Sequence, residues 1–186
     1  AVLDLISHCG KQKDLFKARK LHSDIAAAHR TLVKDLYVST ALIRMYSRCN
    51  SIREAEDTFK SLAIRSIVSW NALICSYVEL RLFEEALVCF RKMRFEGFTP
   101  DSVTFSCVLN ACSRSGLLGE AEIYFGNMRA DYGITPDLKH HACMVAGLGY
   151  TGHFEKAMSV INTMPSRDHL PVWLGLLGAC RKWGNV

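Results

Sequence analysis

Apolar side chains recur at helical spacing along the chain. Leu42, Met45 and Tyr46 follow the i, i+3, i+4 pattern of a buried helix face, and Leu73 and Tyr77 repeat part of it further along. After each such helix, here called helix A, the pattern predicts a turn and a second helix, helix B. Helix B carries an alanine and, four positions later, an aromatic residue. These pairs are Ala55 and Phe59, Ala86 and Phe90, and Ala121 and Phe125.

The pair of helices is a repeating unit. The alanine of helix B recurs at positions 18, 55, 86, 121 and 157, at spacings of 37, 31, 35 and 36 residues. Self-similarity at such a period is typical of solenoids, in which each supersecondary unit buries its apolar face against its neighbours. The sequence therefore predicts an all-helical array of stacked helical hairpins.

The turn between helix A and helix B favours a residue that tolerates left-handed backbone. Gly116 and Gly152 suit this turn and Asn50 is the next best choice, whereas Lys13 and Arg81 at the same place are less suitable. Proline cannot continue a helix, so two units should end where it occurs. These closing turns are Thr99–Asp101 and Thr135–Asp137.

Two families of helical repeat share the alanine and phenylalanine spacing. Tetratricopeptide repeats have a 34-residue period and usually bind proteins, but their full pattern of Trp, Leu-Gly and Tyr along helix A does not occur here. Five segments instead resemble the plant pentatricopeptide repeat (PPR) family, in the PLS subclass that alternates standard, long and short repeats. They are Val68–Ile74, Met93–Asp101, Val103–Cys112, His140–Val145 and Trp173–Cys180.

The resemblance implies a right-handed superhelical α-solenoid of stacked antiparallel helix pairs, and it divides the chain into repeats. The first repeat departs from the family spacing by about two extra residues between His22 and Asp35, so we expect its end to bulge or helix B to lengthen. The segments are 1–35 (L type), 36–66 (S type), 67–101 (P type), 102–137 (L type), 138–169 (S type) and 170–186, a truncated E-type motif.

The resemblance also implies sequence-specific binding of single-stranded RNA, with one base faced by each repeat and read by two side chains. One side chain lies near the start of helix A and the other ends the repeat. Carried over to this sequence, the helix A residues are Thr40, Asn71 and Ser106, and the terminal residues are Asp35, Ser66, Asp101, Asp137 and His169. Leu3 and Ala142 take the helix A position in the outer repeats and cannot form hydrogen bonds with a base.

Asn71 with Asp101 is the pair that favours uracil in the family. An amide can both donate and accept, which matches a uracil edge. The alternative is that Asn71 and Asp101 only cap helices, because short polar residues are favoured at helix starts. The side chains that would pack against bases are Tyr37, Val68 and Val103, although burial between helices is an equally good explanation of them. Arg48 and Arg114 recur late in helix A and are candidates for phosphate contacts.

Composition adds little to this interpretation. The net charge of +5, concentrated in residues 1–66, is compatible with a polyanionic partner. Eight cysteines without any C-x-x-C pair do not predict a zinc site, and the closest cluster, His140, His141 and Cys143, is interpreted as structural. We expect no metal and no other cofactor. No apolar stretch approaches the ~20 residues that a membrane-spanning helix needs.

The sequence offers no catalytic arrangement. Editing-type relatives can carry a zinc deaminase with the signature H-x-E followed by P-C-x-x-C. His153 and Glu155 match the first half alone, at the start of a helix B where an acidic residue is ordinary. The chain is therefore expected not to be an enzyme and to have no small-molecule substrate.

Two hypotheses of function follow. In the first, the chain is the RNA-recognition module of an organellar C-to-U RNA editing factor and positions a target cytidine for a deaminase located elsewhere. In the second, it is a protein-binding scaffold that recruits a small organellar editing cofactor protein, or a tetratricopeptide-like interaction module. The resemblance implies a chloroplast or mitochondrial location and no membrane partner, with the targeting segment outside this sequence.

Overall fold

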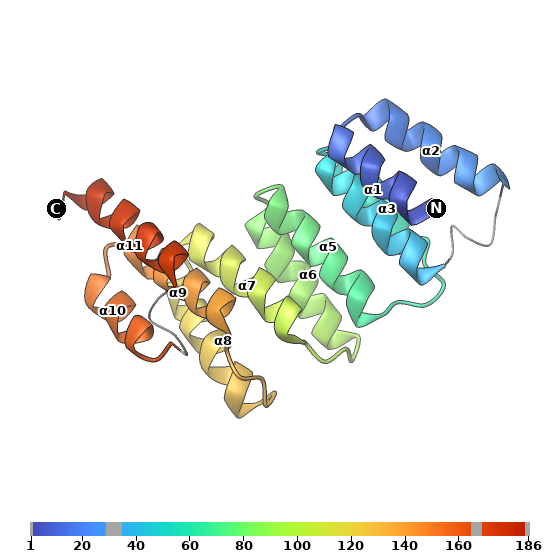
Figure 1. Cartoon of the computed structure of the whole chain (residues 1–186). Coiled ribbons are helices and arrows are strands. Elements are labelled where there is room, and N and C mark those ends of the chain that lie inside the picture. The colour runs from blue at the N-terminus through green and yellow to red at the C-terminus, as the bar shows by residue number, and fades with distance from the viewer. Residues whose placement is uncertain (1, 29–34, 165–168, 185–186) are drawn as a thin grey trace. The chain divides into compact units, whose positions relative to one another are not determined.

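The computed structural model describes residues 2–28, 35–164 and 169–184. These residues form eleven α-helices and no strand (Figure 1). The chain divides into two compact units, Ala1–Thr99 and Pro100–Val186. None of the described helices is both long and apolar enough to cross a membrane.

The first unit consists of three helical hairpins. Within each hairpin the two helices pack against each other, and the first helices of the hairpins, α1, α3 and α5, lie side by side. Each of α2 and α4 also contacts the first helix of the next hairpin. The helices are α1 (Val2–Gln12), α2 (Leu15–Ala28), α3 (Leu36–Arg48), α4 (Ile52–Lys60), α5 (Ile67–Glu79) and α6 (Phe83–Phe95).

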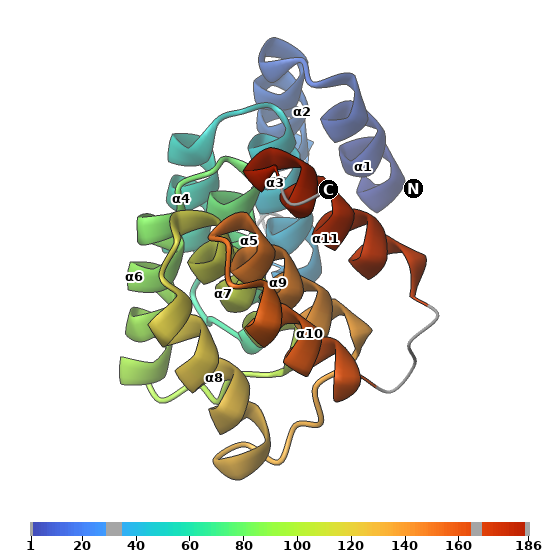
Figure 2. The ribbon, with the colours of Figure 1, turned by 90° about the vertical axis from the view of Figure 1, so that its left-hand side faces the viewer.

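The second unit repeats this arrangement. Helices α7, α9 and α11 lie side by side, α8 pairs with α7, and α9 lies between α10 and α11 (Figure 2). The helices are α7 (Ser102–Ser115), α8 (Leu118–Ala130), α9 (Leu138–Tyr150), α10 (Phe154–Asn162) and α11 (Leu170–Trp183). An all-α fold of stacked helix pairs is therefore confirmed.

The repeated alanine is fully buried in each hairpin. All five copies are 0% exposed, so at each of them helix B approaches its neighbours closely. Of the aromatic residues that follow, Phe59 and Phe90 are buried and Phe125 is half-buried. Each apolar side chain buried in this way contributes about 1.5–3 kcal/mol to folding. The sequence pattern thus located the core of the hairpins correctly.

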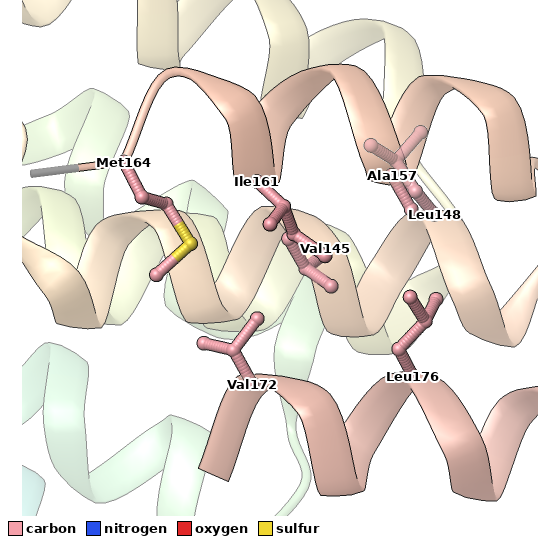
Figure 3. Close-up of a cluster of buried hydrophobic side chains, with 7 residues drawn as sticks. All are labelled: Val145, Leu148, Ala157, Ile161, Met164, Val172 and Leu176. Carbon is pink, nitrogen blue, oxygen red and sulfur yellow. The ribbon is translucent and has the colours of Figure 1, made fainter. Parts of the chain in front are cut away.

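A cluster of seven apolar side chains holds the last three helices together (Figure 3). Ile161 of α10 and Leu176 of α11 approach α9 from opposite sides, and each is less than one-tenth exposed. The other members are Val145, Leu148, Ala157, Met164 and Val172. Because α11 shares this core, the segment that follows the last predicted repeat packs as another helix of the array.

Every turn between helix A and helix B has one residue in left-handed backbone. The φ angles are +78° at Gly116 and +84° at Gly152, as expected for glycine, and 58° at Asn50. Lys13 (φ 56°) and Arg81 (φ 61°) adopt the same conformation although their side chains disfavour it. The geometry of the hairpin therefore overrides local preference at these two turns.

The repeat boundaries remain a prediction. Helices begin at Leu36, Ile67, Ser102 and Leu138, each at the first residue of a predicted repeat. Helix α2 has 14 residues against nine in α4, but the predicted irregularity at the end of the first repeat includes residues 29–34, which lie outside the described residues.

Candidate nucleic-acid interface

A groove of about 400 Å³ runs along the first helices of the first unit. Three of the predicted site residues line it together: Tyr37 and Thr40 from α3, and Val68 from α5. Tyr37 is 73% exposed and Val68 is 46% exposed, whereas Thr40 is buried and only 7% exposed. The groove therefore has a hydroxyl at its base and an aromatic and a β-branched side chain exposed along its walls.

Two arginines of α3 complete the groove. Thr40, Arg44 and Arg48 are spaced four residues apart, so they follow one another along a single helix face, and both arginines are exposed. Sequence analysis considered Arg48 as a phosphate contact but missed Arg44. The i, i+4 spacing from Thr40 was the signal that could have identified it.

The predicted terminal residues are N-caps of the following helices. Asp35 accepts hydrogen bonds from the backbone N–H groups of Tyr37 and Val38, at 3.0 and 3.1 Å. Ser66 and Asp101 form capping boxes at the starts of α5 and α7. These side chains therefore cap the helices that follow them, as the capping interpretation predicts for Asp101.

The cap of α9 differs because its third residue is a histidine. Asp137 accepts from the backbone N–H groups of Lys139 and His140, at 2.9 and 3.2 Å, and its Oδ1 lies 2.6 Å from Nδ1 of His140. Partial burial works to raise the pKa of Asp137, but the backbone and imidazole groups of His140 and the N–H of Lys139 together hold it below the usual range. The carboxylate is thus held in its charged form.

His140 also reaches the preceding helix. Its Nε2 lies 3.1 Å from Oγ of Ser106, the reading residue predicted on α7, and 2.9 Å from the carbonyl oxygen of Ser102. The imidazole is completely buried. One side chain thus joins Ser106 and Asp137, which the sequence had paired, and sequence analysis had assigned it a structural role only.

The remaining predicted site residues belong to both units. Asn71 lies on α5 in the first unit and is 4% exposed, while Asp101 begins the second unit and is half-buried. Val103 is 49% exposed on the first turn of α7. The structure therefore gives Val103 the exposure that a base-packing residue needs. The alternative that Asn71 caps a helix is wrong, because Ser66 is the N-cap of α5 and Asn71 is buried inside that helix.

Other candidate chemistry has structural explanations. In the part of the chain that the structure describes, no three His, Cys, Asp or Glu residues lie close enough together to hold a metal ion. His141 packs edge-on against Phe125, and burial raises the pKa of the Cys143 thiol to about 11. His153 is the N-cap residue of α10 and Glu155 lies in its first turn.

Family models and relatives agree with this architecture. The model of the PPR repeat family matches residues 65–114, and that of the PPR repeat matches residues 37–65, 103–131 and 142–169. A pentatricopeptide repeat-containing protein of Arabidopsis thaliana is 39% identical over 164 residues, which cover 86% of this chain and 33% of that protein. Another, named mitochondrial, is 34% identical over 185 residues, or 100% of this chain and 40% of its own length. The chain spans less than half the length of these relatives.

Solved structures share the fold at low sequence identity. Maize PPR10 in complex with an 18-nt psaJ RNA element is 20% identical, with a TM-score of 0.78 over 98% of this chain and 27% of that one. The PPR domain of Arabidopsis thaliana protein-only RNase P 1 (PRORP1), in complex with tRNA, is 15% identical, with a TM-score of 0.68 over 98% of this chain and 96% of that one. Sequence, family models and fold agree, and the chain belongs to the PPR repeat family.

Proposed function

We propose that this chain is a sequence-specific, single-stranded RNA-binding module in which each repeat faces one base. The observation that carries the proposal is the groove that Tyr37, Thr40 and Val68 line together with Arg44 and Arg48. It combines a surface on which a base can stack, a hydroxyl that can meet a base edge, and two cations for the phosphates.

The physical chemistry of the groove suits single-stranded RNA. Stacking of a base on an aromatic side chain is worth about 1–3 kcal/mol and does not depend on which base it is. Tyr37 is largely exposed, so it can offer its ring to a base without unfolding any part of the unit. Arginines 44 and 48 can neutralise phosphates on the same helix face, and the buried Thr40 hydroxyl can contribute selectivity.

The reading residues are proposed in three pairs. They are Thr40 with Ser66, Asn71 with Asp101, and Ser106 with Asp137. PPR10 and PRORP1 are described in complex with RNA, which supports an RNA partner for this chain. The caps formed by Ser66, Asp101 and Asp137 are compatible with reading, since a side chain fixed by its own helix is already oriented for a ligand.

The finer proposal is that the parent protein belongs to the PLS subclass and acts in organellar C-to-U editing. Alternating repeat lengths and the E-type resemblance of residues 170–186 support it. The chain would position a target cytidine for a deaminase elsewhere and would not itself be catalytic. Three relatives are named mitochondrial, which supports an organellar location in a chloroplast or mitochondrion.

RNA binding and its salt dependence test the groove. Replacing Arg44 or Arg48 with alanine should weaken binding of a selected single-stranded RNA and reduce the slope of log K against log salt by about 0.7 for each lost phosphate contact. Arg53→Ala, which removes another exposed arginine on α4, is the matched control and should leave the slope unchanged. Equal effects of all three variants would show that the groove is not the binding surface.

The uracil pair has its own test. Asn71→Ala should lower affinity most for RNA that carries uracil in the slot of the third repeat, two nucleotides 5′ of the base faced by the fifth repeat. The same variant should bind RNAs with other bases in that slot about as well as the wild-type chain does. Unchanged affinity for the uracil RNA would refute the assignment.

A second candidate function is a scaffold for an editing cofactor protein. Exposed apolar side chains on the predicted L repeat at 102–137 favour it, in particular Ile123 of α8, which is 60% exposed. An Ile123→Glu variant that loses a co-purifying editing cofactor but keeps RNA affinity would support this function. No measurable RNA binding by the wild-type chain at low salt would make the scaffold the better explanation.

A further inference from the structure

The Ser106 hydroxyl lies beside a buried histidine, His140. His140 extends from the first turn of α9 to α7, where its Nε2 lies 2.9 Å from the Ser102 carbonyl oxygen and 3.1 Å from Oγ of Ser106. A carbonyl oxygen can only accept a hydrogen bond, so Nε2 carries a hydrogen.

Nε2 carries this hydrogen whichever partner the other ring nitrogen, Nδ1, binds. When His140 is neutral, Nδ1 accepts from the backbone N–H of Asp137 at 3.1 Å. When it is protonated, Nδ1 can donate to the Asp137 carboxylate, whose Oδ1 is 2.6 Å away. Nε2 carries one hydrogen in both states, and the Ser102 carbonyl oxygen and Oγ of Ser106 share it. The Ser106 oxygen can therefore accept from Nε2 but cannot donate to it.

This arrangement decides the direction of the Ser106 hydroxyl. The Ser102 carbonyl accepts the helical N–H of Ser106, one turn later, and the N–H of His140, which together occupy its two lone pairs. A helical serine often donates to the carbonyl four residues earlier. Here that carbonyl is occupied, so the hydroxyl hydrogen of Ser106 is available to be donated to a ligand.

Thr40, at the equivalent place on α3, has the opposite polarity. Its Oγ1 donates to the Leu36 carbonyl oxygen at 2.7 Å, so its hydrogen is already used within the helix. Helix α5 packs against α3 as α9 packs against α7, and the residue of α5 that corresponds to His140 is Ser69. Ser69 instead bonds to Ser66 within its own capping box, at 2.9 and 3.0 Å. The Thr40 hydroxyl can therefore meet a base only as an acceptor.

We propose that His140 is a positioning residue that makes Ser106 a hydrogen-bond donor toward the RNA base, while Thr40 is an acceptor. The inference rests on the proposed function. It predicts that two hydroxyls in equivalent positions recognise base atoms of opposite hydrogen-bonding type: Ser106 recognises an acceptor and Thr40 recognises a donor. On adenine, Ser106 would contact the ring nitrogen N1, an acceptor, and Thr40 would contact the amino group, a donor.

Nucleotide analogues test this polarity without changing the protein. The probe is a single-stranded RNA selected from a random pool by the wild-type chain, with adenosine at the nucleotide facing α7 or at the one facing α3. Replacement by 1-deazaadenosine, which lacks the N1 acceptor, should weaken binding about three- to tenfold at the Ser106 nucleotide and less than about twofold at the Thr40 nucleotide. Purine riboside, which lacks the amino donor, should give the reverse pattern.

Variants test the part played by His140. His140→Thr removes the donor but keeps a capping box like the one Asp101 forms with Thr104 in α7, and it should reproduce the loss seen with Ser106→Ala. The double variant should lose no more than Ser106→Ala alone, because both changes remove one interaction. His140→Gln, whose amide can still donate, should retain the loss of affinity with 1-deazaadenosine at the Ser106 nucleotide. Circular dichroism should establish that each variant is folded.

The outcomes separate the inference from the proposed function. If Ser106→Ala changes base preference at its nucleotide and His140→Thr does not, the positioning role is wrong while RNA reading stands. If His140→Thr weakens all RNAs equally, its role is only structural and the inference also fails. If neither analogue matters at either nucleotide, base reading by these hydroxyls is itself refuted.

Discussion

Gly147 marks a close approach between α7 and α9, the two helices that hold Ser106 and His140. A Cβ atom added at Gly147 would lie 2.7 Å from both Cβ and Oγ of Ser113 and 3.0 Å from its Cα. Carbon atoms prefer to be about 3.5–4.0 Å apart. Gly147→Ala therefore forces the two helices to separate by roughly 0.5–1 Å.

The free-energy cost of this clash is compared with the stability that alanine usually gains over glycine inside a helix. Overpacking of this kind costs about 1–3 kcal/mol, and the hydrogen bond from Ser113 Oγ to the Cys143 carbonyl, 2.7 Å long, would be strained as well. Alanine in a helix interior gains about 0.5–1 kcal/mol over glycine. The clash outweighs this gain, and we expect a net loss of about 1–2 kcal/mol of folding free energy.

Thermal unfolding followed by far-UV circular dichroism measures this loss. For a chain of this length the melting temperature should fall by about 2–4 °C per kcal/mol. Gly126→Ala is the matched control, because Gly126 lies mid-helix in α8 with nothing within 4 Å of its added Cβ, and it should stabilise by about 0.5–1 kcal/mol. If both substitutions stabilise the protein, the reasoning about the α7 and α9 contact is wrong.

Three further predictions concern stability. Arg81→Gly should stabilise the protein by about 0.5 kcal/mol, because it relieves left-handed strain of about 1–2 kcal/mol at the cost of a more flexible unfolded chain. An unchanged denaturant midpoint would contradict this prediction. The control, Arg53→Gly inside α4, should destabilise the protein by about 1 kcal/mol. Hydrogen bonds from Ser51 and Arg19 lower the pKa of Glu54 from 4.5 to about 2. Their contribution is present above pH 4.5 and lost as the pH falls toward 2, so Glu54→Gln should flatten the stability curve over that range. Asp101→Ala should cost about 1 kcal/mol through loss of the α7 cap. Asp101→Asn should keep stability near wild type and alter base preference, and an Asn variant with unchanged preference would limit Asp101 to capping.

The observed capping role of these side chains is compatible with the proposed reading role. In the α9 cap, every contact between the Asp137 carboxylate and the described residues is made by Oδ1. A carboxylate can accept through both oxygens, so Oδ2 is the atom that can meet a base. Using one oxygen for the helix and the other for the ligand would give the reading group a fixed orientation at no extra entropic cost on binding.

The sequence alone determined the local features of this protein. Helical periodicity identified the helix pairs, the repeated alanine identified their contact points, and Asp101 was recognisable as a helix cap. These features depend on interactions within about four residues, for which residue type and spacing are sufficient. The left-handed turns at Gly116 and Gly152 belong to the same class, because glycine adopts that backbone at little cost.

Only the tertiary structure decided the features that depend on distant neighbours. Lys13 and Arg81 take left-handed backbone because the packed hairpin imposes it against their own preference. Arg44 joins the groove because α1, α3 and α5 lie side by side. His140 meets Ser106 across 34 positions of sequence, and their hydrogen bond sets a polarity that no local pattern encodes. Such contacts depend on how helices stack, and stacking is determined by the packing of whole repeats against one another.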